Sequence, residues 1–277
     1  MIDTHAHLNF KAFAKNLDTT LDEVYAAGIH IAVIPGTDNK SSVRAVEIAQ
    51  KYAGMYAAVG IHPHHVFEEV GKANGKAIDY EHRLSVIKAL LKKARVVAVG
   101  EIGLDRHLYK DTKYTQYQID EEFMTVQKEF FTRQLQFAIQ FGKSVIIHNR
   151  ETADEMLEIL TQKWDKRLEG KVVVHCCEPN RKILQFAIKH RVYIGVDGDI
   201  TYYPAKQKFV QYIPPELLVL ETDSPFLLPE PLKSQKMFPN TPKNLPGIAK
   251  FIAKLRGENE EDFIRQVDEN ASKLFGI

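Results

Sequence analysis

The feature that most constrains the fold of this chain is a regular alternation of short apolar runs with longer amphipathic stretches. Each run is rich in β-branched residues and ends in Gly, His, Asp or Glu. Runs that are apolar throughout are typical of parallel strands, because helices cover both faces of a parallel sheet. Eight such runs occur: IDTHAH (2–7), HIAVIPG (30–36), YAAVGIH (56–62), VVAVGE (96–101), SVIIH (144–148), KVVVH (171–175), VYIGVD (192–197) and LLVLETD (217–223).

The stretches between the runs have apolar residues at three- and four-residue spacing, which indicates amphipathic helices. Repeated strand–helix units predict the α/β class and closure into a (β/α)8 TIM barrel. A doubly wound open sheet is the alternative, which is disfavoured because no Gly-rich phosphate loop follows the first run. The expected helices cover 21–27, 42–53, 82–94, 123–142, 153–164, 180–190 and 204–213, with two closing helices at 247–257 and 262–276.

The length and composition are those of one globular barrel. The chain has 277 residues without a linker, repeat or low-complexity tract, so we expect a single domain over 1–277. No long apolar run or secretory signal is present, so no membrane span is expected. The adjacent Cys176 and Cys177 are poor disulfide partners, which favours a reducing cytoplasmic location. The net charge of +1 does not indicate a wide nucleic-acid footprint, and it is compatible with a pocket that grips a few phosphates.

Potential metal-binding side chains stand where the predicted strands end. The carboxyl ends of barrel strands meet at one mouth, and alternate strand residues point the same way, so His5 and His7 can face one ion. Imidazole and carboxylate donors suit Zn²⁺, Mn²⁺ or hydrated Mg²⁺, and Glu101 could bridge two ions. Each residue alone has a structural explanation, but together they predict a metal site. The residues are His5, His7, His62, Glu101, His148, His175 and Asp223.

Two long connections, 102–118 and 224–244, should lie at the same mouth of the barrel. The first carries three tyrosines among lysines, a pattern that could stack on a single nucleic-acid strand. The alternative is a solvated loop that packs on its own tyrosines. These residues are Tyr109, Lys110, Lys113, Tyr114 and Tyr117.

The segments DTHAHL, GIHPHH, GEIGLD, HNR, HC and ETDSPFL occur in the order and spacing of the TatD-family metal-dependent deoxyribonucleases of the amidohydrolase superfamily, which this chain resembles over roughly residues 2–277. The resemblance implies two divalent ions (Mg, Mn or Zn) that share Glu101, with His5, His7 and Asp223 on one ion and His148 and His175 on the other. It further implies that His62, His64 and Arg150 bind the substrate phosphate.

The activity that the resemblance implies is hydrolysis of DNA phosphodiester bonds, as a 3′-5′ exonuclease on single strands, by a metal-activated hydroxide. Glu101 and Asp223 would be the catalytic residues.

Three segments depart from the family pattern. Cys177, Glu178 and Pro179 follow HC where the family usually has an aromatic residue, a small residue and Gly. Arg106 and His107 follow GLD in place of Tyr. The segment PNTPKN replaces the usual Arg-Asn-Glu-Pro, so its Lys243 is a candidate replacement for the arginine.

Because these changes affect the rim of the expected substrate site, two further hypotheses stay open. One is an ester or amide hydrolase of the same superfamily, for example an aminoacyl-RNA deacylase. The other is a non-catalytic subunit that binds nucleic acid or a protein partner in a larger assembly. Arg150 separates the two enzymes, since its loss should abolish phosphodiester cleavage and spare a neutral ester.

Overall fold

Eight parallel strands, hydrogen-bonded in chain order, form the centre of the molecule. The computed structural model describes residues 1–73 and 77–277. The strands are β1 (Ile2–Asp3), β2 (Ile31–Pro35), β3 (Met55–Val59), β4 (Val96–Asp105), β5 (Ser144–Arg150), β6 (Val172–Val174), β7 (Tyr193–Val196) and β8 (Leu218–Leu220).

The last strand returns to the first. The Thr4 amide donates to the Leu220 carbonyl at 3.1 Å, and beyond the strand ends the Asp223 amide donates to the His5 carbonyl at 2.9 Å. A further parallel bridge joins Ala6 to Ser224. The sheet is therefore a nearly closed barrel, which confirms the predicted (β/α)8 fold and excludes the open sheet.

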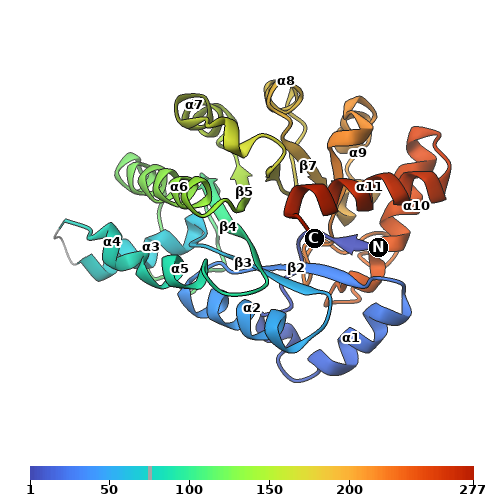
Figure 1. Cartoon of the computed structure of the whole chain (residues 1–277), viewed down its shortest axis with the longest axis horizontal. Coiled ribbons are helices and arrows are strands. Elements are labelled where there is room, and N and C mark those ends of the chain that lie inside the picture. Colours follow the sequence, from blue (N-terminus) through green and yellow to red (C-terminus); the bar gives the residue numbers. More distant parts are fainter. Residues whose placement is uncertain (74–76) are drawn as a thin grey trace.

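Helices surround the barrel as a ring outside the strands (Figure 1). The long helix α6 begins after Asp120, whose carboxylate accepts a hydrogen bond from the Phe123 amide, and ends at Gly142, which has a left-handed φ of 66°. The helices are α1 (Leu17–Ala26), α2 (Asn39–Lys51), α3 (Pro63–Ala73), α4 (Tyr80–Arg83), α5 (Ser85–Leu90), α6 (Glu121–Phe141), α7 (Ala153–Lys163), α8 (Arg181–His190), α9 (Pro204–Phe209), α10 (Leu245–Arg256) and α11 (Glu260–Phe275).

Three local predictions were wrong. The helix α3 was not expected, although Pro63 suits the first turn of a helix. The first strand ends at Asp3 and not at His7. The fourth strand continues to Asp105, so the long connection begins at 106 and not at 102; the buried Ile102 and Leu104 extend the pairing with β5 after a register shift.

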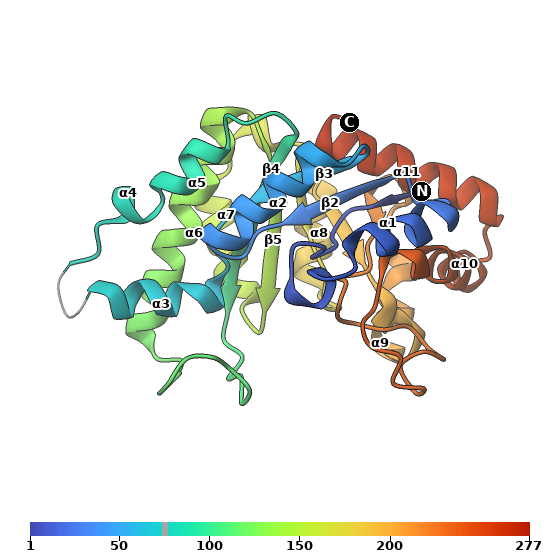
Figure 2. The ribbon, with the colours of Figure 1, turned by 90° about the horizontal axis from the view of Figure 1, so that it is seen from below.

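One end of the barrel is filled by an apolar layer to which every strand contributes one buried side chain. The helix α11 covers this layer with Ala271, Leu274 and Phe275. Figure 2 shows α11 and the connections after β4 and β8 at opposite ends of the barrel. The carboxyl ends of the strands thus remain open for a site. The layer consists of Ile2, Val33, Ala58, Ala98, Ile146, Val173, Tyr193 and Val219.

No helix in the described residues is both long and apolar enough to span a bilayer.

Candidate active site

The predicted strand-end residues meet at the open end of the barrel. Four of them, which we call the first donor group, are His5, His7, Glu101 and Asp223. The Nε2 atoms of His5 and His7 are 3.1 Å apart. The Glu101 Oε2 atom lies 3.5 Å from both nitrogens, and the Asp223 Oδ1 atom lies 3.6 and 3.5 Å from them.

The other oxygen of Glu101 faces a second donor group, formed with His148 and His175. The Glu101 Oε1 atom lies 3.0 Å from His148 Nδ1 and 2.7 Å from His175 Nε2. His62 Nε2 lies 3.5 Å from the same oxygen. One carboxylate therefore joins the two groups. His62 also lies near the second group, where its imidazole could bind one ion together with Glu101 and His148.

The spacing of these donors suits divalent ions. Ligands about 2.1 Å from an octahedral or tetrahedral ion lie about 3.0–3.4 Å from one another. The nitrogens and oxygens of both groups are 2.7–3.6 Å apart. His7 Nδ1 lies 3.2 Å from the Pro35 carbonyl, which accepts its proton, so Nε2 presents a lone pair to the group. Two facing imidazole nitrogens beside two carboxylates fit a cation between them.

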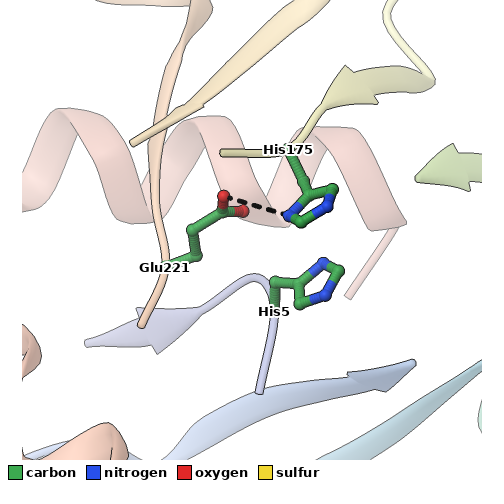
Figure 3. Close-up of side chains that lie close together, drawn as sticks. All are labelled: His5, His175 and Glu221. Carbon is green, nitrogen blue, oxygen red and sulfur yellow. Dashed lines mark ion pairs between the residues drawn. The ribbon is translucent and has the colours of Figure 1, made fainter. Parts of the chain in front are cut away.

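Carboxylates that the sequence reasoning missed orient the histidines from behind. Asp105 Oδ2 lies 2.9 Å from His148 Nε2. Glu221 Oε1 lies 3.6 Å from His175 Nδ1, and the rings of His175 and His5 stack with their centroids 4.0 Å apart (Figure 3). Carboxylates behind metal-binding histidines fix their orientation. Both acids stand in the quoted motifs GEIGLD and ETDSPFL, but nothing local indicates which histidine each one meets.

The charges of the two groups are strongly coupled. Burial would raise the pKa of Glu101, but His175, His62 and His5 around it hold that pKa well below its usual range. Burial would lower the pKa of His148, but hydrogen bonds to Asp105 and Glu101 raise it to about 9. Glu101 is therefore a carboxylate at neutral pH, which suits a bridging ligand.

Two buried glutamines of α6 hold the backbone on which the site is built. Gln127 accepts a hydrogen bond from the Asp105 amide at 2.9 Å and donates to the Asp105 carbonyl at 3.0 Å. Gln134 does the same for Ile61, the residue before His62, at 2.7 and 3.1 Å. The two glutamines are seven positions apart, which is about two helical turns, so they lie on one face of the helix. The sequence reasoning missed both.

The donor groups lie in a pocket of about 620 Å³ whose lining includes the predicted phosphate-binding residues His62, His64 and Arg150. In the described part of the chain Arg150 forms no ion pair; its Nη1 donates to the Tyr109 hydroxyl at 3.3 Å. His64 Nε2 lies 2.8 Å from the Thr112 hydroxyl. The guanidinium of Arg150 is therefore available to an anion in the pocket.

Aromatic rings that were not singled out from the sequence line another part of the pocket. Phe10 stacks on His7 with the ring centroids 4.3 Å apart. Phe226 lies at 6.1 Å from Phe10, and 46% of its surface is exposed. The rim beside the first donor group is thus apolar and aromatic.

The tyrosines of the first long connection were expected either to stack on a nucleic-acid strand or to pack within the protein, and the structure places them differently. Tyr109 lines the pocket. Tyr114 and Tyr117 instead pack against His64 and Phe67, with centroids 4.7–5.6 Å apart. Packing of the loop against α3 therefore accounts for these two tyrosines.

Two of the departures from the family pattern lie away from the pocket, and the expectation that Lys243 replaces the arginine at the rim was wrong. Lys243 does not line the pocket; its Nζ pairs with Glu23 of α1 at 2.6 Å, because it lies at the start of the segment that packs on α1. Arg106 does not face substrate either, since it forms ion pairs with Glu121 and Glu155 on α6 and α7. Glu178 does lie at the rim, where it is exposed.

A nearly closed (β/α)8 barrel with histidines and carboxylates gathered at the carboxyl ends of its strands is the architecture of a metal-dependent hydrolase. Comparison with known proteins specifies the family. The model of the TatD family, described as TatD related DNase, matches residues 2–276, and the chain belongs to that family.

Similar proteins cover the whole chain. The uncharacterized metal-dependent hydrolase YabD of Bacillus subtilis (strain 168) is 31% identical over 280 residues, which are 100% of this chain and 99% of YabD. The 3'-5' ssDNA/RNA exonuclease TatD of Citrobacter rodentium (strain ICC168) is 32% identical over 286 residues, 100% of this chain and 98% of that protein. The crystal structure of YJJV, a TatD homolog from Escherichia coli K12, superposes with a TM-score of 0.82 at 26% identity and covers 100% of this chain and 98% of its own.

Proposed function

We propose that this enzyme is a 3′-5′ exonuclease that hydrolyses single-stranded DNA with two divalent ions (Mg, Mn or Zn), and that residues 1–277 form one catalytic domain. The observation that carries the proposal is the carboxylate of Glu101, whose two oxygens face two histidine groups inside one pocket. Relatives with this family's fold include proteins named as ssDNA/RNA exonucleases. Free cysteines agree with a cytoplasmic location.

His5, His7, Glu101 and Asp223 would hold one ion, and Glu101, His148 and His175 the other. When bound, the ions would activate water and neutralise charge on the phosphate. Asp223 has a partly exposed carboxylate in the pocket, so it can orient the attacking water and accept its proton.

The remaining pocket residues would bind the substrate strand. The Arg150 guanidinium can fork onto two phosphate oxygens, because no carboxylate of the described chain competes for it. His62 and His64 would donate to the same phosphate, and His62 is also placed to complete the second donor group. The rings of Phe10 and Phe226 offer a stacking surface for a nucleobase.

The test is hydrolysis of 5′-labelled single-stranded DNA with Mg²⁺, Mn²⁺ or Zn²⁺. We expect stepwise shortening by the wild type, and Arg150→Ala should slow it about 100- to 1000-fold. Arg44→Ala, on the outer surface of α2, is the matched control, because Arg44 pairs only with its helix neighbour Glu47 among the described residues. If Arg150→Ala cleaves DNA at the wild-type rate, Arg150 does not bind the substrate phosphate.

The same assay separates the alternatives. A wild type that holds metal after dialysis but leaves DNA intact would favour an ester or amide hydrolase, which Arg150→Ala should not impair. A chain that takes up no metal would favour a non-catalytic subunit of a larger assembly.

A further inference from the structure

A buried lysine occupies the pocket wall beyond strands β6 and β7. Lys206 of α9 is 1% exposed. Its Nζ donates to Asp199 at 2.8 Å, to Asp197 at 3.3 Å and to the Cys176 sulfur at 3.7 Å. Those three groups could together hold a cation, and the Lys206 ammonium lies among them. Of these four residues, the sequence reasoning considered only Cys176.

The contacts of Lys206 determine what a substrate meets at this wall. An ammonium has three N–H donors, and all three are directed at protein atoms. The Asp197 carboxylate is fully buried, whereas the Asp199 carboxylate is 14% exposed and lines the pocket. A ligand therefore meets Asp199, an oriented hydrogen-bond acceptor.

The charge of this wall is unsuited to phosphate. Two aspartates surround one ammonium, and the exposed Glu178 lies at the same side of the rim. Burial and the neighbouring Asp197 raise the pKa of Asp199 to about 7, so both aspartates are carboxylates above that pH. Like charges repel, so an anionic group next to Asp199 is disfavoured. A neutral hydroxyl that donates to the carboxylate is favoured.

The wall also lies away from His62 and His64, two of the three proposed phosphate-binding residues, whereas Arg150 on β5 is two strands from it. Because eight strands run in order round the barrel, the loop after β7 is opposite the loop after β3, which carries His62 and His64. The acidic Asp111 is at the rim on that side, but it is exposed and follows β4. Tyr203, 41% exposed, lies four residues after Asp199 and offers a ring beside it for a sugar or base.

We propose that Asp199, held by Lys206, receives the free 3′-hydroxyl of the terminal nucleotide and so selects strands that end in a hydroxyl over strands that end in a phosphate. This specificity rests on the proposed nuclease function. The Asp199 carboxylate favours one end and disfavours the other, since it accepts a hydrogen bond from a terminal hydroxyl and repels a terminal phosphate. Thymine strands are the suitable probe, because thymine has no exocyclic amino group that could donate to Asp199 in place of the sugar.

The experiment compares 5′-labelled oligothymidylates that end in 3′-hydroxyl or 3′-phosphate, with Mn²⁺ at about pH 8, above the raised pKa of Asp199. The hydroxyl end should be cleaved at least about tenfold faster by the wild type. Asp199→Asn should bring the two rates within about threefold of each other, chiefly by accelerating the phosphate end. Asp154→Asn, an exposed aspartate on α7 outside the pocket, should keep the wild-type ratio.

Equal rates for both ends in the wild type, or a wild-type ratio in Asp199→Asn, would overturn the proposal. Binding of phosphorothioate versions, measured by fluorescence anisotropy, separates this failure from failure of the nuclease function. If no strand is cleaved, tighter binding of the hydroxyl end that disappears in Asp199→Asn still supports the proposed end recognition. Equal binding of the two ends by the wild type refutes it. If Asp199→Asn does not fold, Asp199→Glu keeps the charge beside Lys206 but displaces it, and should weaken binding of the hydroxyl end alone.

Discussion

Replacing Gln127 by methionine should loosen the active site from the helix behind it. The Gln127 side chain is fully buried and makes two hydrogen bonds, one to the amide and one to the carbonyl of Asp105. Methionine has nearly the same length and shape but can make neither bond. Each unpaired buried group costs about 1–3 kcal/mol, so the two together cost about 2–6 kcal/mol. Burying a thioether in place of an amide recovers about 1–2 kcal/mol.

The expected net loss of stability is therefore about 2.5 kcal/mol (range roughly 0–5), or a decrease in melting temperature of about 5 °C (at most roughly 10 °C) for a chain of this size. The local effect is sharper. The Asp105 amide loses its acceptor, so hydrogen exchange in the peptide that contains Asp105 should accelerate. Since the Asp105 carboxylate lies 2.9 Å from His148 Nε2, metal affinity should fall as well.

Gln136→Met is the matched control, because Gln136 is exposed on the same helix. Its melting temperature and exchange pattern should stay at wild-type values. Melting and exchange are measured on all three proteins in chelator, which removes any metal contribution. If Gln127→Met exchanges its Asp105 amide at the wild-type rate, the hydrogen-bond reasoning fails.

Three further predictions concern metal and pH. Calorimetry should show that Mn²⁺ at 100 times its dissociation constant stabilises the fold by about 2.7 kcal/mol per bound ion relative to chelator, and an unchanged melting temperature would argue against the donor groups. Glu101→Ala removes an oxygen from both groups, so metal analysis should find loss of bound ions and hydrolysis should fall about 1000-fold; two retained ions would contradict the shared carboxylate. Hydrogen bonds from Arg106 and Lys128 lower the pKa of Glu155 from 4.5 to about 2, so this carboxylate stabilises the fold above its unfolded pKa and loses that effect as the pH falls towards 2. Glu155→Gln should therefore cost about 1–2 kcal/mol at pH 7 and little at pH 2, and unfolding midpoints that differ equally at both pH values would contradict this account.

The sequence by itself was sufficient for the barrel and for the meeting of the strand-end histidines and carboxylates at one mouth. Alternating apolar runs and helical periodicity report burial, and burial is a local property that each segment carries in its own residues. In a parallel barrel the carboxyl ends of the strands must meet, so residues at those ends could be grouped without coordinates. His5 and Asp223 were placed in one site in this way, although 218 positions separate them along the chain.

The tertiary structure alone decided which polar group meets which. Arg150 and Lys243 were both candidate contacts for substrate, but Lys243 pairs with a glutamate of α1 and Arg150 lines the pocket. The reason is physical: the partner of a charged side chain depends on distance and desolvation, which the order of residues along the chain does not specify.

The same reason explains the supporting residues. Asp105 acts on His148 across 43 positions, and Lys206 lies among Cys176 and two aspartates that come from different strand ends. Nothing in the neighbouring residues of Lys206 indicates that its side chain is buried in the pocket wall. Periodicity therefore determined where the site lies, and packing decided how its donors are held and what a substrate meets beside them.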